Sequence, residues 1–429
     1  MNGVIAESNG HKESPGPSTP DTEETDANAF RAANGSGSCG RPGGCCRDDP
    51  NAKGCGSAKP TEAEITPPSS PGKSFMERTF LPYDASTEPI FPPSLWKYEP
   101  RPICYGDERR LWFRPTSLKQ LVELKAVYPS AKIVGGASET QIEVRFKKMN
   151  YRVSVFAADI PELNSHEDPS ELSQAKLNTL KEITIPGNLS LTKVENLCTN
   201  LYRKLGRRAL PLEALRKQLR YFAGRQIRNV ASLAGSLATA SPISDSAPVL
   251  LAAGARVSVL SRKLGAFDIP LSSWFVSYRT TALPEDGVIT QIVIPLAEEE
   301  SLEITKAYKQ AKRKDDDIAI VTSGLRVRLD QDGMVQDSGF AFGGMAPTTV
   351  IAAKAQEAVA SKRWADTATL EAAMDALLEQ FDLPFGVPGG MAHYRRGLSH
   401  QSPVVLQQAN ALISLDHIHV LPFLARGCQ

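Results

Sequence analysis

A loop of small residues after a predicted strand is the first feature of this sequence that could do chemistry. Lys132–Val134 is expected to be a short strand, and Gly135, Gly136, Ala137 and Ser138 follow it directly. Consecutive backbone N–H groups in such a loop can cradle a pyrophosphate. Glycines after a strand are more often simply a turn. The loop alone therefore leaves both interpretations open.

A second stretch, residues 221–245, carries small and hydroxylated side chains where an ordinary core would have leucine and valine. Hydroxyl groups of this kind can hydrogen-bond a polar ligand without crowding it. The residues concerned are Ser232, Ser236, Thr239, Ser241 and Ser244. This composition favours a polar ligand at the stretch over simple packing.

The elements that would position these stretches follow from periodicity and capping signals. We expect strands over Leu111–Arg114 and, from alternating apolar side chains, over Ile142–Phe146. Capping boxes, in which a hydroxyl side chain bonds the first helical turn, predict helices that begin near Ser117 and Thr192. Further along, a helix is expected over 212–222, and strands over 257–260 and 288–295.

A second unit is expected to begin near Ile304. Ile318–Arg328 and Met334–Phe342 are predicted strands, and Asp332–Gly333 between them is a strong hairpin signal. Helices are expected over 350–360 and 367–381, the second with one apolar face. The pattern predicts an α+β unit separate from the first.

A series of stretches, in order along the chain, resembles the FAD-binding domain of the xanthine dehydrogenase family of molybdenum hydroxylases. The stretches are 133–140, 221–245, 308–321, 342–347 and 389–396, and the resemblance covers roughly residues 80–396. It implies an α+β fold: a two-subdomain FAD-binding fold of the molybdenum-hydroxylase flavoprotein type, followed by a smaller α+β C-terminal flavoprotein subdomain.

Carried over position by position, the resemblance implies a set of cofactor-binding residues. The residues that would wrap the FAD phosphates and ribose are Ile133, Val134, Gly135, Gly136, Ala137, Ser138, Glu139 and Thr140. Those that would bind pyrophosphate are Ser232, Leu233, Ala234, Gly235 and Ser236, with Thr239 in the same stretch. The remaining ones are Phe222 against the isoalloxazine, Asp245 on the adenosine side, Val288 as an apolar contact, Lys309 near the flavin edge and Asp316 facing the flavin, where it would tune access of NAD.

Simpler interpretations stand beside two of these assignments. Phe222 is also what a core aromatic at a helix end looks like. Asp316 also fits a solvated charge cluster between Lys314 and Asp317. The chain departs from the family pattern at Ala234–Gly235–Ser236, where Gly-Gly-Asn is usual, and at Ala247, where asparagine is frequent. We therefore expect weaker FAD binding than is usual in the family.

Composition narrows the class of protein. The chain has 429 residues, 41% of them apolar and 23% charged, with a net charge of +1. These values are ordinary for a globular protein and give no reason to expect nucleic acid or a membrane surface as partner. No apolar run is long enough to span a membrane, and the N-terminus lacks the apolar region of a secretory signal. We expect a cytoplasmic protein.

The resemblance and the composition together predict five segments along the chain. They are a disordered linker over 1–74, an extended strap over 75–102, the FAD-binding domain over 103–300, its C-terminal subdomain over 304–396 and an unrelated tail over 397–429. Cys39, Cys45, Cys46 and Cys55 fall in the linker with a spacing that does not match a plant-type ferredoxin. No metal site and no catalytic side-chain constellation is expected.

The leading hypothesis is the FAD-binding electron-transfer module of a xanthine dehydrogenase-like enzyme. In that family, electrons pass from a molybdenum centre through iron–sulfur clusters to FAD and then to NAD or oxygen, and the iron–sulfur and molybdopterin domains would be missing here. Two alternatives stay open: a non-catalytic fragment that docks to such subunits, and a stand-alone FAD oxidase. The resemblance leaves the oligomeric state uncertain.

Overall fold

The computed structural model describes Pro92, Leu95 and residues 97–415, except 166, 167, 299, 300 and 315. Contacts divide the chain into two units, Met1–Trp96 and Lys97–Gln429, and almost all described residues lie in the second. The predicted linker with its four cysteines, most of the predicted strap and residues 416–429 of the predicted tail lie outside the described part.

The first layer of the second unit is a four-stranded sheet in the order β1-β2-β4-β3. Its strands, and the helices between and after them in sequence, are β1 (Ile103–Gly106), β2 (Leu111–Arg114), β3 (Lys132–Val134), β4 (Val153–Phe156), α5 (Leu118–Val127), α6 (Thr140–Arg145) and α7 (Pro161–Asn164). β2 and β3 both run parallel to β4, so that the carboxyl ends of β3 and β4 lie at the same end of the sheet. The predicted helix start is confirmed, because the Ser117 hydroxyl accepts the Gln120 N–H at 3.3 Å.

The strand predicted over Ile142–Phe146 is wrong, because this segment forms helix α6. Ile142, Val144 and Phe146 alternate in sequence, but they are 44%, 41% and 71% exposed, so no sheet buries one face of them. Alternation predicts a strand only where one face meets a core. The chain instead closes a short helix in which the Phe146 N–H donates to the Ile142 carbonyl.

The second layer is an antiparallel sheet in the order β5-β10-β6-β7, which packs against two amphipathic helices. Its elements are β5 (Glu182–Pro186), β6 (Arg256–Ser261), β7 (Gly265–Pro270), β10 (Val288–Pro295), α9 (Leu191–Leu205) and α10 (Leu210–Arg220). On α9 the buried side chains recur every three or four residues, at Leu191, Val194, Leu197, Leu201 and Leu205. Strands β6 and β10 confirm the two predicted there.

Two helix boundaries in this layer differ from the predictions. Helix α9 is capped by Ser190, whose hydroxyl accepts the Lys193 N–H, rather than by Thr192. The Thr192 hydroxyl instead donates to Asn229 Oδ1 at 2.7 Å, a partner 37 residues away that the local pattern cannot reveal. Helix α10 ends at Arg220, so Phe222 lies in the turn that follows it.

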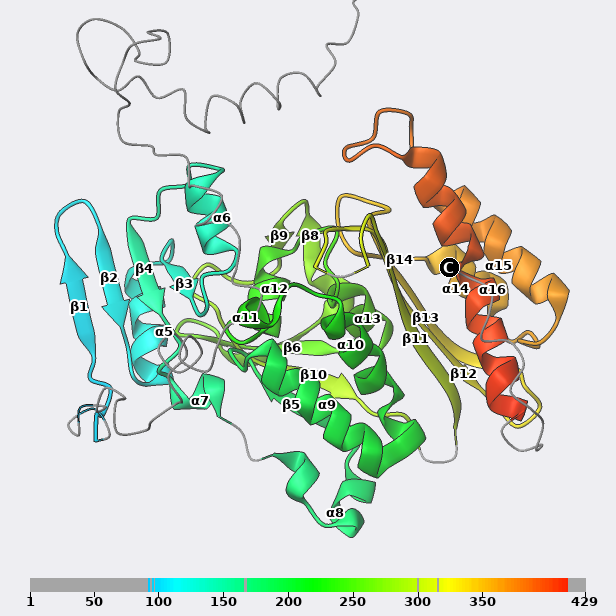
Figure 1. Cartoon of the computed structure of the whole chain (residues 1–429), viewed down its shortest axis with the longest axis horizontal. Coiled ribbons are helices and arrows are strands. Elements are labelled where there is room, and N and C mark those ends of the chain that lie inside the picture. Colours follow the sequence, from blue (N-terminus) through cyan, green and yellow to red (C-terminus); the bar gives the residue numbers. More distant parts are fainter. Residues whose placement is uncertain are drawn as a thin grey trace, which may run out of the picture. The chain divides into compact units, whose positions relative to one another are not determined.

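The third layer is the antiparallel sheet β11-β12-β13-β14, with helices on both faces. Its elements are β11 (Leu302–Ala311), β12 (Ala319–Leu329), β13 (Val335–Gly343), β14 (Val350–Ile351), α14 (Ala353–Val359), α15 (Thr367–Gln380) and α16 (Ala392–Leu415). Helices α14 to α16 lie together on one side of this sheet (Figure 1). The hairpin predicted at Asp332–Gly333 is confirmed by the pairing of β12 with β13.

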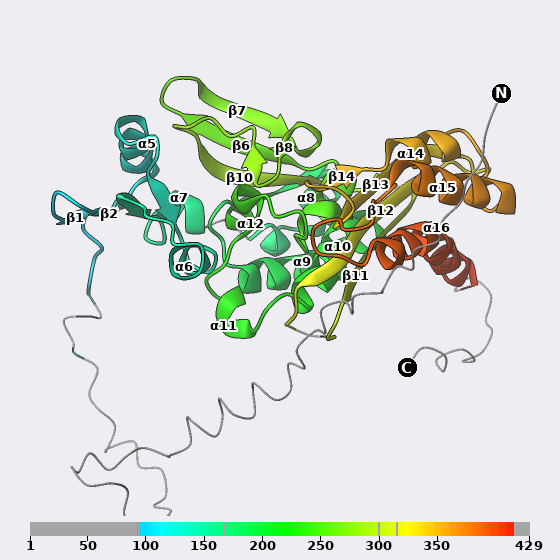
Figure 2. The same cartoon turned by 90° about the horizontal axis from the view of Figure 1, so that it is seen from above.

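The third layer is fastened to the second by close backbone contact with helix α13 (Ala247–Ala252). A Cβ atom on Gly324 of β12 would lie 2.3 Å from the Pro248 carbonyl oxygen, and one on Gly339 of β13 would lie 2.2 Å from that of Ala252. Only glycine permits this approach. Figure 2 shows α10 and β11 side by side, in agreement with their packing contacts.

Shorter elements connect the three layers. They are α8 (Gln174–Thr179), α11 (Arg225–Arg228), α12 (Leu233–Thr239), β8 (Phe275–Ser277), β9 (Thr280–Thr281) and the 3-10 turns Pro169–Glu171, Gly206–Ala209 and Leu271–Ser273. The helix predicted over 350–360 begins only at Ala353, because Val350 and Ile351 pair with β13. The predicted boundary after Arg396 falls inside α16. Among the described residues, no helix has the length and apolarity that crossing a membrane requires.

Candidate functional site

The loop that follows β3, residues 135–139 (here the glycine loop), has backbone donors to spare. None of its five consecutive N–H groups donates a hydrogen bond to another described residue, and all five residues are half-buried. Ala137 adopts a left-handed conformation, with φ of 56°. Adjacent N–H groups in a turn of this kind form a concave anion site. The predicted phosphate cradle therefore has the backbone donors that it needs.

The glycines of this loop are required by packing against other segments. A Cβ atom on Gly136 would lie 2.2 Å from the Val230 carbonyl oxygen, and one on Gly135 would lie 2.2 Å from Asn188 Oδ1. The contact at Gly136 is with backbone and cannot be tolerated, whereas at Gly135 the Asn188 side chain would have to move. Because Gly135 and Gly136 have no side chains, the glycine loop packs against the segment just before α12. Two stretches nearly 100 residues apart in sequence therefore meet.

Most polar groups are already paired in residues 232–246 (here the serine segment), which cover the later part of the predicted 221–245 stretch and one residue beyond it. Ser232 caps α12, and its hydroxyl accepts the Gly235 N–H at 3.2 Å. The Ala234 N–H donates to the Gly187 carbonyl, and the Thr239 hydroxyl donates to that of Gly235. Leu233 is buried in the hydrophobic core that the second sheet shares with helices α9 and α10 (here the central core), and it anchors α12. The Thr239 hydroxyl is therefore occupied by its own helix.

Three serine hydroxyls gather where the serine segment turns into α13. Ser236 Oγ lies 3.2 Å from Ser244 Oγ and 3.2 Å from Ser246 Oγ. Ser244 Oγ also accepts the Ala247 N–H, and its carbonyl accepts the Thr322 hydroxyl of β12. Serine hydroxyls can donate and accept, so this cluster can turn toward a polar ligand.

A buried ion pair joins the serine segment to the third layer. Lys309 Nζ of β11 lies 2.9 Å from Asp245 Oδ1, and the two side chains are only 6% and 10% exposed. The same ammonium donates to the Tyr221 carbonyl at 3.0 Å. Burial raises the pKa of Asp245, while Lys309 acts in the opposite direction. The structure thus brings together two predicted residues that lie 64 positions apart.

The other predicted residues differ in what their side chains contact. Phe222 is half-buried against the central core, next to the Lys309 partner Tyr221. Val288 is 1% exposed and lies in the first-layer core with Leu121 and Val155, where little of it is free for a ligand. Asp316 is exposed, with φ of 50°, and its carbonyl accepts Arg313 Nη2. Among the described residues, no hydrogen bond or ion pair joins Asp316 to the glycine loop.

Some residues beside the predicted site were missed from the sequence. Arg279, between β8 and β9, donates to Glu139 Oε1 at 2.7 Å and so ties the end of the glycine loop to that small hairpin. Lys147 lies 3.2 Å from the same oxygen. Asn188 and Val230 line the loop through the contacts described above. No local signal marks Arg279, Asn188 or Val230, because each contacts the loop from far away in sequence.

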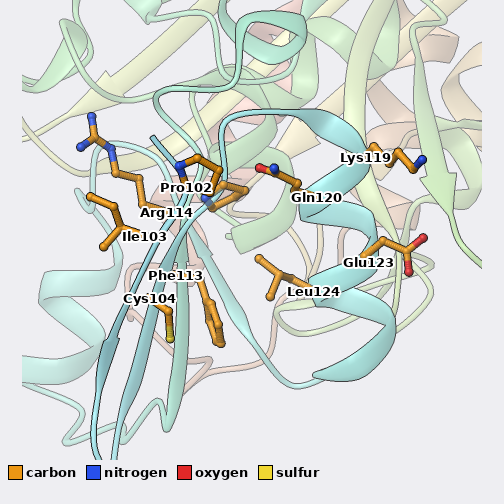
Figure 3. A pocket seen from close by; sticks show the side chains of 10 residues that line it. Pro102, Ile103, Cys104, Phe113, Arg114, Lys119, Gln120, Glu123 and Leu124 are labelled. Atoms are coloured by element: carbon orange, nitrogen blue, oxygen red, sulfur yellow. The ribbon is translucent and has the colours of Figure 1, made fainter. Parts of the chain in front are cut away.

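A pocket of about 450 Å³ lies elsewhere, between the first sheet and α5. Figure 3 shows Cys104 and Phe113 on the strands facing the Leu124 side of the helix. Its lining is mostly apolar and contains none of the predicted cofactor residues. This pocket therefore contributes nothing to the candidate site.

Comparison with known proteins identifies the family to which this chain belongs. Residues 105–297 match the family of the FAD binding domain in molybdopterin dehydrogenase, and residues 306–403 match that of the CO dehydrogenase flavoprotein C-terminal domain. The chain belongs to the flavoprotein family of the molybdenum hydroxylases. The second match runs past the predicted boundary at Arg396, to residue 403 within α16.

Long relatives of this flavoprotein module share much of its sequence. A nicotinate hydroxylase of Emericella nidulans is 46% identical over 372 residues, which are 85% of this chain and 27% of the relative. A xanthine dehydrogenase of the same organism is 44% identical, over 83% of this chain and 25% of its own length. The chain thus spans about a quarter of the length of the curated relatives it matches.

Solved structures agree on the fold. The CO dehydrogenase from Hydrogenophaga pseudoflava has a chain with a TM-score of 0.59 and 19% identity, covering 70% of this chain and 96% of the solved one. Quinoline 2-oxidoreductase from Pseudomonas putida 86 has a chain with a TM-score of 0.58 and 20% identity. The α+β fold expected from the resemblance is confirmed.

Proposed function

We propose that this flavoprotein module binds FAD between the glycine loop and the serine segment and serves as the electron outlet of a larger molybdenum hydroxylase. The observation that carries the proposal is the run of five N–H groups from Gly135 to Glu139 that have no partner among the described residues and lie beside the start of α12. A dinucleotide needs such donors for its phosphates. The site is also lined by small residues, which leave room for a bulky cofactor.

Each segment has a distinct task in this proposal. The glycine loop binds the phosphates and ribose of FAD through its backbone, and Ser232 to Ser236 hold the pyrophosphate from the other side. Asp245, kept in place by Lys309 at 2.9 Å, accepts a hydrogen bond from a cofactor hydroxyl. Phe222 offers an apolar face to the isoalloxazine ring of FAD. Asp316 lies where NAD approaches that ring.

When bound, FAD would supply hydride and single-electron exchange. The residues of this chain orient the cofactor and limit what reaches it. In the longer relatives' class of enzyme, electrons would arrive from iron–sulfur clusters and leave to NAD or oxygen. We propose NAD as acceptor, iron–sulfur and molybdenum domains as partners, and the cytoplasm as the location. Residues 1–74 would serve as the linker to those domains.

The visible absorption spectrum of the purified chain tests this proposal, followed by addition of NADH without oxygen. A flavin spectrum that NADH bleaches supports both the cofactor site and hydride exchange. A flavin spectrum that NADH leaves unchanged keeps the FAD site and removes the NAD assignment. A colourless chain that takes up no added FAD contradicts the proposal.

A further inference from the structure

One arginine of α16 holds two loops of the third layer together. Arg395 Nη1 donates to the Gly344 carbonyl at 3.0 Å, and Nη2 donates to the Pro388 carbonyl at 2.8 Å. Gly389 leaves room for the guanidinium, because a Cβ atom there would lie 2.5 Å from Arg395 Nη2. The arginine is only 7% exposed. It therefore bridges the turn after β13 and the loop before α16 from a buried position.

A buried arginine at this position has a cost that packing alone does not explain. Arg395 has no ion pair with any described residue, and its buried Nε atom has no hydrogen-bond partner among them. Burial lowers the pKa of Arg395, because the charged form loses solvation. A buried cation without a counter-charge is destabilising, and an apolar side chain of similar volume is often better for stability. The arginine therefore indicates a role beyond filling the core.

The turn held by Arg395 is bonded in turn to the serine segment. The Gly344 N–H donates to the Pro242 carbonyl at 2.7 Å. Gly344 has φ of 82°, and a Cβ atom there would lie 2.3 Å from the Ile320 carbonyl oxygen, so only glycine fits. One residue thus accepts a hydrogen bond from α16 and donates another to the serine segment.

This connection joins the two faces of the third sheet. On β12, Val321 lies in the core that contains Leu406 of α16, whereas Gly324 lies against Pro248 of α13. Side chains an odd number of residues apart on a strand point to opposite faces. Helix α16 is therefore on one face, and the serine segment leads into α13 on the other. Gly344, at the end of β13, connects the two.

The bond from Gly344 differs from the other hydrogen bond that a backbone carbonyl of the serine segment accepts from the third layer. That one comes from the Thr322 hydroxyl of β12, which donates to the Ser244 carbonyl at 3.1 Å. Thr322 is fixed by strand pairing, but Gly344 lies just beyond the paired part of β13. Connecting segments move more than the strands that they join. The Gly344 turn therefore depends on Arg395 as an anchor.

We propose that Arg395 is a positioning residue for the cofactor, acting through the Gly344 turn on Pro242 and so on the serine segment. The proposal rests on the proposed FAD site and adds a residue of α16 to its support. A shift of Pro242 would displace Ser244, whose hydroxyl lies 3.2 Å from that of Ser236. Binding groups must be held close to their productive geometry, so a small displacement weakens the site.

Titration of the full chain with FAD, followed by quenching of flavin fluorescence, tests the proposal. Arg395→Met should weaken FAD binding by at least about tenfold, equivalent to roughly 1.4 kcal/mol. The matched control is Arg396→Met, at the next residue of the same helix, where Arg396 Nη1 lies 3.5 Å from Asp382 Oδ1. Ion pairs of this partly exposed kind contribute little, so the control should change FAD affinity by less than about twofold. Arg395→Lys keeps the charge without the planar fork and should give an intermediate affinity.

Amide hydrogen exchange of the chain without FAD tests the same link independently of the cofactor. In Arg395→Met the Gly344 N–H should exchange faster, while the amides of α9 keep their rates. Arg396→Met should leave Gly344 unchanged. If Arg395→Met does not fold, Arg395→Lys and Arg396→Lys take the places of the two variants in both experiments. A chain that binds no FAD would refute the proposed function, and exchange at Gly344 would still show whether Arg395 fixes the turn.

Three outcomes would overturn the proposal. Equal FAD affinity in Arg395→Met and Arg396→Met would show that the bridge does not reach the cofactor. Lower thermal stability of Arg395→Met with unchanged exchange at Gly344 would mean that the arginine only fastens α16. Full FAD affinity in Arg395→Lys would assign the effect to the charge and not to the bridge between two carbonyls.

Discussion

The glycine loop and the serine segment face the same proposed ligand, but they differ in what they still offer to it. The loop from Gly135 to Glu139 has five N–H groups with no partner among the described residues. In the serine segment, by contrast, the N–H groups of Ala234 and Gly235 are already bonded within the chain. The glycine loop therefore still has free hydrogen-bond donors among the described residues. The serine segment, whose donors are bonded within the chain, is a prearranged platform for the ligand.

The difference follows from how each is anchored. The glycine loop is held by close contacts with Asn188 and Val230, by the pairing of Glu139 with Arg279 and Lys147, and by the first turn of α6. The serine segment is tied down by buried Leu233 and by the Asp245–Lys309 pair. Prearranged groups lose less entropy on binding. The serine segment, with more anchors, should therefore lose less entropy on ligand binding than the glycine loop.

Breaking the platform at its ion pair should have the largest effect. Asp245→Asn leaves the Lys309 ammonium buried without a counter-charge, which we expect to cost about 3–5 kcal/mol of unfolding free energy. Urea unfolding followed by circular dichroism measures it. The double variant Asp245→Asn, Lys309→Met removes both charges and should recover most of the loss. A single variant as stable as the unchanged protein would show that the pair does not hold the platform.

Filling the loop should have the next largest effect. Gly136→Ala places a Cβ atom 2.2 Å from the Val230 carbonyl oxygen, so the loop must move away from α12. We expect a loss of about 1–3 kcal/mol in stability and a larger relative loss in FAD affinity, measured by quenching of flavin fluorescence. Gly397→Ala in α16, where a Cβ atom would meet nothing within 4 Å, is the control. Unchanged FAD affinity in Gly136→Ala would contradict the role of the loop.

The pH dependence of stability tests the charge of Asp245 separately from that of Lys309. The pKa of Asp245 is already above its ordinary value of 3.8, because the carboxyl is buried. In Lys309→Met this pKa should rise further, so ionising Asp245 costs more in the folded state, by roughly 1.4 kcal/mol per pKa unit. This cost is absent below the unfolded pKa and grows as pH rises through the folded one. We therefore expect the variant to lose stability, relative to the unchanged protein, as pH rises above the ordinary pKa of 3.8, and a gap that narrows instead would refute this.

Removing the helix cap should have the smallest effect. Ser232→Ala deletes the hydroxyl that accepts the Gly235 N–H, which typically costs about 1 kcal/mol. Because the platform has other anchors, thermal unfolding should shift by a few degrees while FAD affinity falls only slightly. Ser232→Thr keeps the hydroxyl and is the control. A collapse of FAD binding in Ser232→Ala would mean that the hydroxyl contacts the ligand directly.

Local sequence was sufficient wherever the interaction lies within a few residues. The Ser117 cap, the Asp332–Gly333 hairpin and the glycine loop after β3 were all predictable, because each depends on the chemistry of adjacent side chains. The order of the flavin-like stretches along the chain also pointed to the fold. Each of these local features depends on residues that are close together in sequence, so it does not need a distant partner.

Long-range contacts were decided by the folded structure alone. Residues 140–145 form a helix because no partner strand or core covers their alternating apolar side chains. The Thr192 hydroxyl bonds Asn229 instead of capping a helix, and Arg279 reaches Glu139 across 140 positions. Asp245 and Lys309 become an ion pair only when β11 packs beside the serine segment. Such pairings depend on where distant segments meet in space, and no local periodicity or capping pattern encodes that.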